Sequence, residues 1–279
     1  MKVSFVDDPI VANFDSVLLA NYSYTEELFS EELFSDLSET PEFSDSIYDL
    51  RIKALDAKTP IDLVYNPFVK QYINVYTKQR RTQMSRMMGL AEYYFPMFEQ
   101  ALDKYNIPLE LKYLAIVESA LRPTATSRVG ATGLWQFMFS TGKMFGLNVN
   151  SYVDDRSDPL KATDAACKYL QALHKRLGDW DLALAAYNSG PGNVSKAIRR
   201  SGGRINYWNI RQHLPRETAG YVPAFLATMY IFEYSKQHGF NSDGPRIPYI
   251  ATDTIHIKKQ IALEQSIGRQ IIILCWTEK

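Results

Sequence analysis

The sequence of 279 residues lacks the features that mark several common classes of protein. It has only two cysteines, and Cys167 falls inside a helical pattern while Cys275 lies near the end, so they predict no disulfide framework and leave the redox compartment open. Residues 1–25 have neither the basic start nor the unbroken apolar stretch of a signal peptide. No run of residues is long enough and apolar enough to span a bilayer. We therefore expect either an intracellular chain or one whose export signal lies outside this sequence.

Basic residues are scarce at the beginning of the chain. Residues 1–50 contain 12 acidic residues and one basic residue, Lys2, although the formal net charge of the whole chain is zero. Residues 51–279 consequently carry 30 basic residues against 19 acidic ones. No dense Lys/Arg block or basic helix accompanies this excess, so nucleic acid is not an expected partner, whereas a polyanionic polymer is compatible with it.

Composition divides the chain into three parts. Residues 1–60 are acidic and Ser-rich and repeat the pentad EELFS, which predicts a segment that is partly disordered or weakly helical. Residues 61–240 are dense in helix signals. Residues 241–279 form a C-terminal extension, in which IPYIATDTIHI has a β-like composition and indicates the start of a second domain that is cut short.

The helix signals predict that the middle part is all-α. Asp158 is a predicted N-cap, Pro159 a first helical residue and Gly178 a stop, which together define one long helix. A shorter, Ala-rich helix should end between Asn188 and Gly192. Residues 217–239 are apolar almost all round, as expected for a helix that runs through the centre of a core.

One carboxylate, Glu118, falls on the apolar side of a predicted helix. At 100° per residue it projects with Leu111, Leu114 and Ala115, and the helical pattern stops before Pro123. Burial and the negative end of the helix dipole both raise a carboxyl pKa, and a raised pKa suits a general acid near neutral pH. The structural alternative is an ion pair of Glu118 with Arg122 or Arg128, and position alone favours that alternative.

The loop that follows, SRVGATGLWQF, favours the general acid over the structural ion pair, because its composition suits a sugar groove. Its glycines allow close approach of the backbone, and it supplies aromatic rings for stacking and polar groups for hydrogen bonding. The stacking candidates are Trp135, Phe137 and Phe139, and the hydrogen-bonding candidates are Ser127, Gln136 and Asn188. Each has a simpler alternative, since Trp135 also suits a core, Asn188 suits a helix C-cap and Tyr187 suits packing.

These residues resemble the lytic murein transglycosylase domain of glycoside hydrolase family 23. The resemblance is carried by Glu118-Ser119 with the glycine loop, and then by DDRSDPLKATDAACKYL, GDWDLALAAYNSGPGNVSKAI and RETAGYVPAFLA in the family order. It covers residues 84–236 and is closest to the membrane-bound D type, whose preceding YNPFVKQYINVYTKQRR region the chain shares. It implies a lysozyme-like helical fold, peptidoglycan glycan strands as substrate, and neither a metal nor another cofactor.

The resemblance also implies roles for individual residues. Glu118 falls on the catalytic acid/base of the family, and the glycan groove around it is lined at Ser127, Gln136, Met138, Tyr187 and Glu217, with Asn188 shaping the same pocket. Ser127 would contact the acetamido region of N-acetylmuramic acid, while Tyr187 and Gln136 would orient the sugar and the carboxyl group. Phe137 and Phe139 depart from the aliphatic residue and the proline of many members, which affects subsite packing more than chemistry.

A single carboxylate is sufficient for the chemistry that the resemblance implies. Most glycosidases need two carboxylates, and enzymes assisted by their own substrate are the exception. Candidate second carboxylates are Asp154, Asp155, Asp158, Asp181 and Glu217, of which Asp158, Asp181 and Glu217 have helix-capping or first-turn roles available. Glu118 would protonate the bond between N-acetylmuramic acid and N-acetylglucosamine and then deprotonate the C6 hydroxyl, leaving a 1,6-anhydro end.

Two alternatives remain open from the sequence. One is a goose-type lysozyme-like or chitinase-like hydrolase of the same fold, in which an aspartate positions water. The other is a catalytically silent glycan-binding module, in which Glu118 is a paired core residue. The resemblance places the protein in the periplasm or cell envelope, with membrane association through a segment absent from this sequence. That localisation is an expectation, since no signal peptide precedes the chain.

Overall fold

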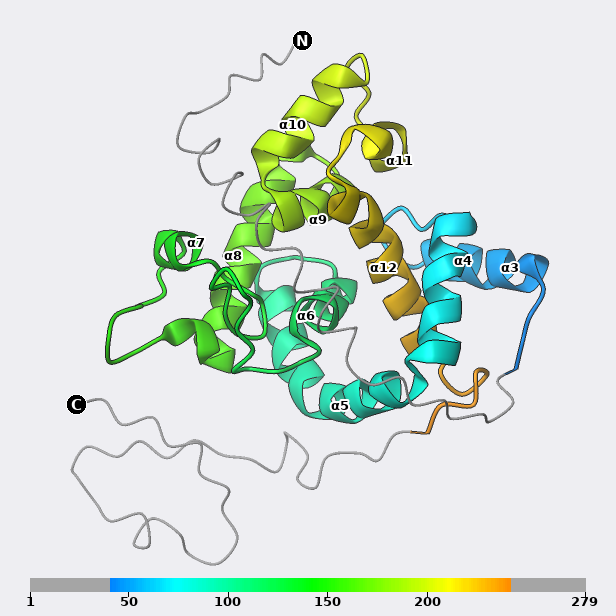
Figure 1. The fold of residues 1–279 in the computed structure, drawn as a ribbon, viewed down its shortest axis with the longest axis horizontal. Helices are drawn as coiled ribbons and strands as arrows, with labels where there is room; N and C mark the ends of the chain where they lie inside the picture. The colour runs from blue at the N-terminus through cyan, green and yellow to red at the C-terminus, as the bar shows by residue number, and fades with distance from the viewer. Residues whose placement is uncertain (1–40, 242–279) are drawn as a thin grey trace, which may run out of the picture.

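The computed structural model describes residues 41–241, and these residues fold into helices and loops without a β-strand (Figure 1). The described α-helices are α3 (Asp45–Asp56), α4 (Pro67–Asn74), α5 (Arg81–Lys104), α6 (Leu114–Ser119), α7 (Phe139–Met144), α8 (Pro159–Leu177), α9 (Trp180–Ser189), α10 (Pro191–Arg200), α11 (Tyr207–Ile210) and α12 (Arg216–Glu233). A π-helical turn, Val75–Gln79, follows α4, and a 3₁₀ turn, Leu109–Tyr113, precedes α6. The predicted all-α fold is confirmed for this part of the chain.

Local signals fix the ends of α8 as the sequence predicts. The Asp158 side chain accepts hydrogen bonds from the backbone N–H groups of Leu160 and Lys161, and Pro159 is the first helical residue. Gly178 ends the helix in the left-handed conformation, with φ of 74°. Residues within a few positions of one another therefore determine both ends of this helix.

Helix α12 runs through the centre of the core, as its apolar sequence predicts. Twelve of its residues are buried, from Thr218 to Ile231. It packs against α4 on one side and against α9 on the other, and α6 also contacts it (Figure 1). Since α12 touches elements from the beginning and the middle of the described chain, side chains on it can meet residues far away in the sequence.

The acidic N-terminal part contributes to the core through α3. Tyr48, Ile52 and Leu55 are buried, and the Tyr48 ring lies 5.6 Å from that of Tyr230 in α12. A folded unit that began at residue 61 would lose these contacts, so we propose that the unit includes α3. The EELFS repeat and the β-like segment after Gly244 lie outside the described residues.

No helix among residues 41–241 combines the length and the apolar character that a membrane crossing requires.

Candidate active site

Glu118 lies in α6, a helix of six residues that is buried along its whole length. The predicted helix that contains Leu111 and Glu118 is divided in two, because residues 109–113 form a 3₁₀ turn. The part that carries Glu118 ends at Ser119, earlier than Pro123, because Ala120 and Leu121 adopt left-handed φ values of 51° and 59°. The carboxyl side chain of Glu118 is only 7% exposed, which confirms the prediction that it belongs to the buried side.

A hydroxyl from the central helix holds the Glu118 carboxyl group. The Tyr221 hydroxyl of α12 donates a hydrogen bond to Glu118 Oε1. Arg122 and Arg128, the cations of the structural alternative, are both exposed. Nothing in the sequence indicates Tyr221, because this tyrosine belongs to a helix that is apolar all round and no periodicity singles it out.

The surroundings of Glu118 give it the titration behaviour of a general acid. Burial raises the pKa of its carboxyl group to about 7, and the hydrogen bond from Tyr221 opposes that rise in part. At neutral pH both the protonated and the ionised form are therefore populated. A group with this pKa can donate a proton in one step and accept one in the next.

The loop after α6 is tied directly to the helix that carries Glu118. The Ser119 hydroxyl donates to the carbonyl oxygen of Leu134, 2.9 Å away, and also to that of Ala115. Gly133 has φ of 88°, and a Cβ atom there would lie 1.8 Å from the carbonyl oxygen of Arg156. Gly130 has the same φ but open space around it, so close approach of the backbone is confirmed only for Gly133.

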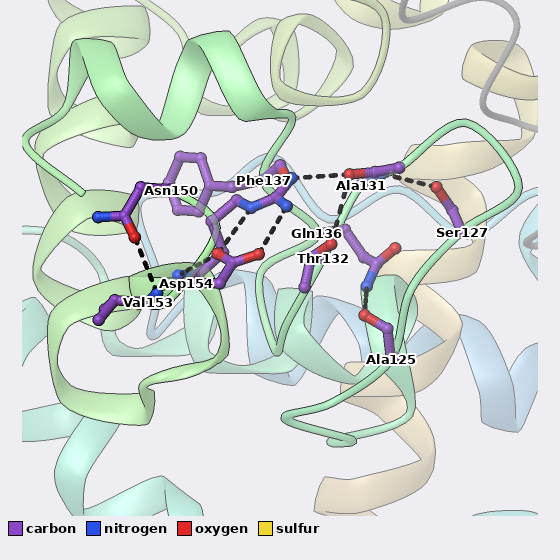
Figure 2. Close-up of polar contacts among 11 residues, drawn as sticks. Ala125, Ser127, Ala131, Thr132, Gln136, Phe137, Asn150, Val153 and Asp154 are labelled. Carbon is purple, nitrogen blue, oxygen red and sulfur yellow. Dashed lines mark hydrogen bonds and ion pairs between the residues drawn. The ribbon is translucent and has the colours of Figure 1, made fainter. Parts of the chain in front are cut away.

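Hydrogen bonds within the loop hold two of the predicted glycan-contacting residues, Ser127 and Gln136 (Figure 2). The Ser127 hydroxyl oxygen accepts from the backbone N–H of Ala131 at 2.9 Å. The Gln136 amide nitrogen donates to the carbonyl oxygens of Ala125, at 3.2 Å, and Gly133, at 2.8 Å. Both side chains are therefore fixed by the loop backbone.

Tyr187 joins α9 to the same loop. Its hydroxyl donates to the carbonyl oxygen of Trp135 at 2.7 Å, and the residue is 7% exposed. Burial raises the pKa of Tyr187 well above its ordinary value, and the charge of Glu118 adds to that rise, so the two groups are electrostatic neighbours. Asn188 is fully buried one residue before the last residue of α9, and Gly190, not Asn188, is the C-cap.

The remaining predicted groove residues lie at helix starts. Met138 is the N-cap of α7 and Glu217 lies in the first turn of α12, one turn before Tyr221, and both are half-buried. Their place in the groove therefore rests on the resemblance alone. The geometry therefore brings together Glu118, Tyr221, Tyr187 and the loop, and leaves Met138 and Glu217 as predictions.

Two of the three predicted stacking rings belong to the core. Trp135 is 0% exposed and donates from Nε1 to the Thr163 hydroxyl at 2.9 Å, and Phe137 is 2% exposed. Neither ring can stack on a sugar, so this expectation was wrong for both. Phe139 is 50% exposed and retains the surface that stacking needs.

The other candidate carboxylates have structural partners or lie away from Glu118. Asp154 pairs with Arg156, Asp155 with Lys161, and Asp158 caps α8. Within residues 41–241, no group of three or more His, Cys, Asp or Glu side chains could hold a metal ion.

Asp181 is a buried carboxyl group outside the site. It is 2% exposed, and neither carboxyl oxygen has a hydrogen-bond partner among the described residues. Burial raises its pKa well above the ordinary value, and the negative charges of Asp179, Asp62 and Asp56 raise it further. Asp181 is therefore a cost to stability at neutral pH rather than a second catalytic carboxylate.

The burial of Asp181 predicts that Asp181→Asn increases the free energy of unfolding by an amount that depends on pH. Because the folded-state pKa is the higher one, the contribution of Asp181 to stability is fully present below its unfolded-state pKa of 3.8 and is lost as the pH rises. We expect the free energy of unfolding of the variant, relative to the parent, to increase steadily from pH 4 to pH 7. Urea denaturation at several pH values measures this, and a pH-independent difference would contradict it.

The sequence of this chain is similar to proteins named as lytic transglycosylases. Residues 96–209 match the family model described as the transglycosylase SLT domain. The chain is 43% identical to membrane-bound lytic murein transglycosylase D of Escherichia coli (strain K12) over 153 residues, which are 53% of this chain and 33% of that protein. It is 35% identical to the soluble lytic murein transglycosylase of the same strain over 148 residues, 50% of this chain and 23% of that one.

A solved structure also resembles the chain. The 70-kDa soluble lytic transglycosylase of Escherichia coli has a TM-score of 0.47 and 22% identity, over 80% of this chain and 43% of that one. The chain thus spans about a third or less of the length of the two curated relatives. Together with the buried glutamate and its glycine loop, the match to the family model identifies residues 96–209 as a transglycosylase SLT domain.

Proposed function

We propose that this protein is a peptidoglycan lytic transglycosylase, which cleaves the β-1,4 bond between N-acetylmuramic acid and N-acetylglucosamine without consuming water. The observation that carries the proposal is a buried glutamate with a pKa of about 7, held by a tyrosine hydroxyl inside an SLT domain. The names of the relatives support the same reaction and the same substrate. This substrate places the action of the protein in the periplasm or cell envelope.

In the proposed reaction Glu118 performs both proton transfers. Protonated Glu118 donates its proton to the glycosidic oxygen as the bond from that oxygen to C1 of N-acetylmuramic acid breaks. The acetamido carbonyl oxygen of the same sugar bonds to C1 and carries the positive charge. Glu118, now a carboxylate, accepts the proton of the C6 hydroxyl, whose oxygen bonds to C1 and displaces the acetamido oxygen. A 1,6-anhydro ring results, and Glu118 is protonated again.

The other proposed site residues bind and orient the glycan. Ser127, Gln136, Met138 and Glu217 would line the groove, and Asn188 would shape its floor. We assign Tyr187 a positioning role, because its hydroxyl is engaged by the carbonyl oxygen of Trp135 in the loop. Removal of that hydroxyl would leave a buried carbonyl oxygen without its donor, so the role of Tyr187 includes stability as well as turnover.

The mass of the released fragments tests the proposed reaction. Intramolecular closure leaves each fragment one water lighter than hydrolysis does. Purified sacculi digested with the full chain should therefore yield muropeptides with 1,6-anhydro ends. Fragments at the hydrated mass would favour the lysozyme-like hydrolase, and binding to sacculi without release would favour the silent glycan-binding module.

Tyr221→Phe should shift the pH dependence of turnover. The Tyr221 hydrogen bond lowers the pKa of Glu118, so its loss raises that pKa above about 7. Because the protonated form of Glu118 acts first, the fall of kcat/KM on the alkaline side should move to higher pH. Tyr113→Phe removes another hydroxyl bonded to a glutamate, Glu233 at 2.7 Å, and should leave the profile in place. Identical profiles for the parent and Tyr221→Phe would remove Tyr221 from the mechanism.

A further inference from the structure

The loop between Ala125 and Phe137 is held from outside by one buried arginine of the segment before α8. Arg156 is 8% exposed, and its Nη1 donates to the carbonyl oxygens of Gly130, at 2.7 Å, and Phe137, at 3.1 Å. These two carbonyl groups flank the part of the loop that contains Gly133 and Gln136. The arginine therefore fixes both ends of that part with a single nitrogen atom.

Asp154 fixes the arginine in turn. Its Oδ1 accepts from Arg156 Nε at 2.9 Å, and its Oδ2 accepts from Nη2 at 2.7 Å, which is a bidentate pair. The Arg156 guanidinium and backbone N–H hold the pKa of the Asp154 carboxyl group below its ordinary value. Figure 2 shows Asp154 left of centre and Ser127 at the right, with Thr132 and Gln136 of the loop between them. The guanidinium group is thus bonded to a carboxylate on one edge and to the loop on another.

The loop needs such a support because one of its residues, Gln136, is not in a relaxed backbone conformation. Gly130 and Gly133 have φ of 88°, which glycine adopts without strain, whereas Gln136, which is not a glycine, has φ of 45°. Conformations of this kind persist only where the surrounding structure determines them. Gly133 also packs against the backbone of Arg156 itself, so the same residue limits the loop by contact and by hydrogen bonds.

We propose that Arg156 and Asp154 are positioning residues, which together hold the loop so that Ser127 and Gln136 face the glycan at the right distance from Glu118. The proposal rests on the proposed function. The hydrogen bonds that hold Arg156 and Asp154 do not include Glu118. The two residues act on the site through the carbonyl oxygens of Gly130 and Phe137, which accept from Arg156. Displacement of reacting groups by about 1 Å can cost a hundredfold in rate.

Asp154→Asn and Arg156→Lys test the proposal. Asparagine cannot form the same bidentate pair, and a lysine ammonium cannot reproduce the planar fork of arginine. At a temperature well below the melting temperature of every variant, we expect kcat/KM on sacculi to fall about ten- to a hundredfold. The pH at which kcat/KM falls should remain that of the parent, in contrast to Tyr221→Phe.

Asp164→Asn is the matched control, because Asp164 pairs with Lys168 at 2.7 Å on α8 and makes no described contact with the loop. Hydrogen exchange without substrate supplies the second readout. Backbone amides of residues 125–137 should exchange faster in Asp154→Asn than in Asp164→Asn, while those of α12 should not.

The two measurements separate the possible failures. Faster exchange with unchanged kcat/KM would limit the pair to a structural role and overturn the proposal, and so would unchanged exchange. A parent protein that releases no 1,6-anhydro fragments would refute the proposed function. The exchange comparison would then still show whether the pair holds the loop.

Discussion

Glu118→Gln is expected to lower the turnover of sacculi by about two to four orders of magnitude, the usual range for loss of a general acid/base. Glutamine keeps the size of the side chain and an oxygen that can accept from Tyr221, but it can neither donate nor accept the transferred proton. The variant should therefore fold. Release of muropeptides from sacculi, followed with time, measures the effect.

The same variant should be more stable than the parent above neutral pH. Burial raises the pKa of Glu118 from 4.5 to about 7, so the stability contributed by its protonated form is lost as the pH rises through that interval. This difference between the two pKa values corresponds to a free energy of unfolding on the order of 3 kcal/mol. The parent loses that stability above neutral pH, and the variant does not. Glu99→Gln, at a half-buried pair with Lys112, is the control for both readouts. A fully active Glu118→Gln would return Glu118 to the structural role that its helix position first suggested.

Ile52→Ala in α3 is expected to destabilise the full chain by about 2–5 kcal/mol, the range for truncation of a buried aliphatic side chain. Ile52 is 3% exposed and belongs to the core, although it lies in the part of the sequence that composition describes as accessory. For a folded unit of this size, such a loss lowers Tm by roughly 10 °C. Thermal unfolding followed by circular dichroism measures it.

A comparison of two fragments extends this prediction to the boundary of the folded unit. Residues 41–241 should unfold at a clearly higher temperature than residues 61–241, which lack α3. Leu50→Ala is a control within α3, since Leu50 is 68% exposed and its truncation should change Tm little. Equal melting temperatures for the two fragments would restore the boundary at residue 61.

Features that depend on neighbouring residues could be predicted from the sequence. The ends of α8 follow from Asp158, Pro159 and Gly178, which act within one turn of the positions that they define. The burial of Glu118 follows from its spacing to Leu114 and Ala115. In each case the cause lies in a few adjacent residues, so the pattern contains the information.

Features that depend on distant residues could not be predicted in the same way. Tyr221 meets Glu118 across 103 positions, and Arg156 meets Gly130 across 26, and nothing in the local pattern of either residue indicates its partner. The burial of Trp135 has a related cause. A tryptophan suits a core and a sugar groove equally well, and Thr163 of α8, the partner of its Nε1, decides between them.

The way in which Arg156 holds the loop does not depend on the side chains at the two positions that it contacts. Its two contacts are with carbonyl oxygens, which every amino acid possesses, so the side chains at positions 130 and 137 are not what the arginine recognises. Libraries that diversify the exposed positions of this loop could therefore alter glycan preference without rebuilding the scaffold, provided that the buried residues such as Trp135 and Phe137 are kept and that glycine remains at 133, where a Cβ atom would meet the backbone of Arg156.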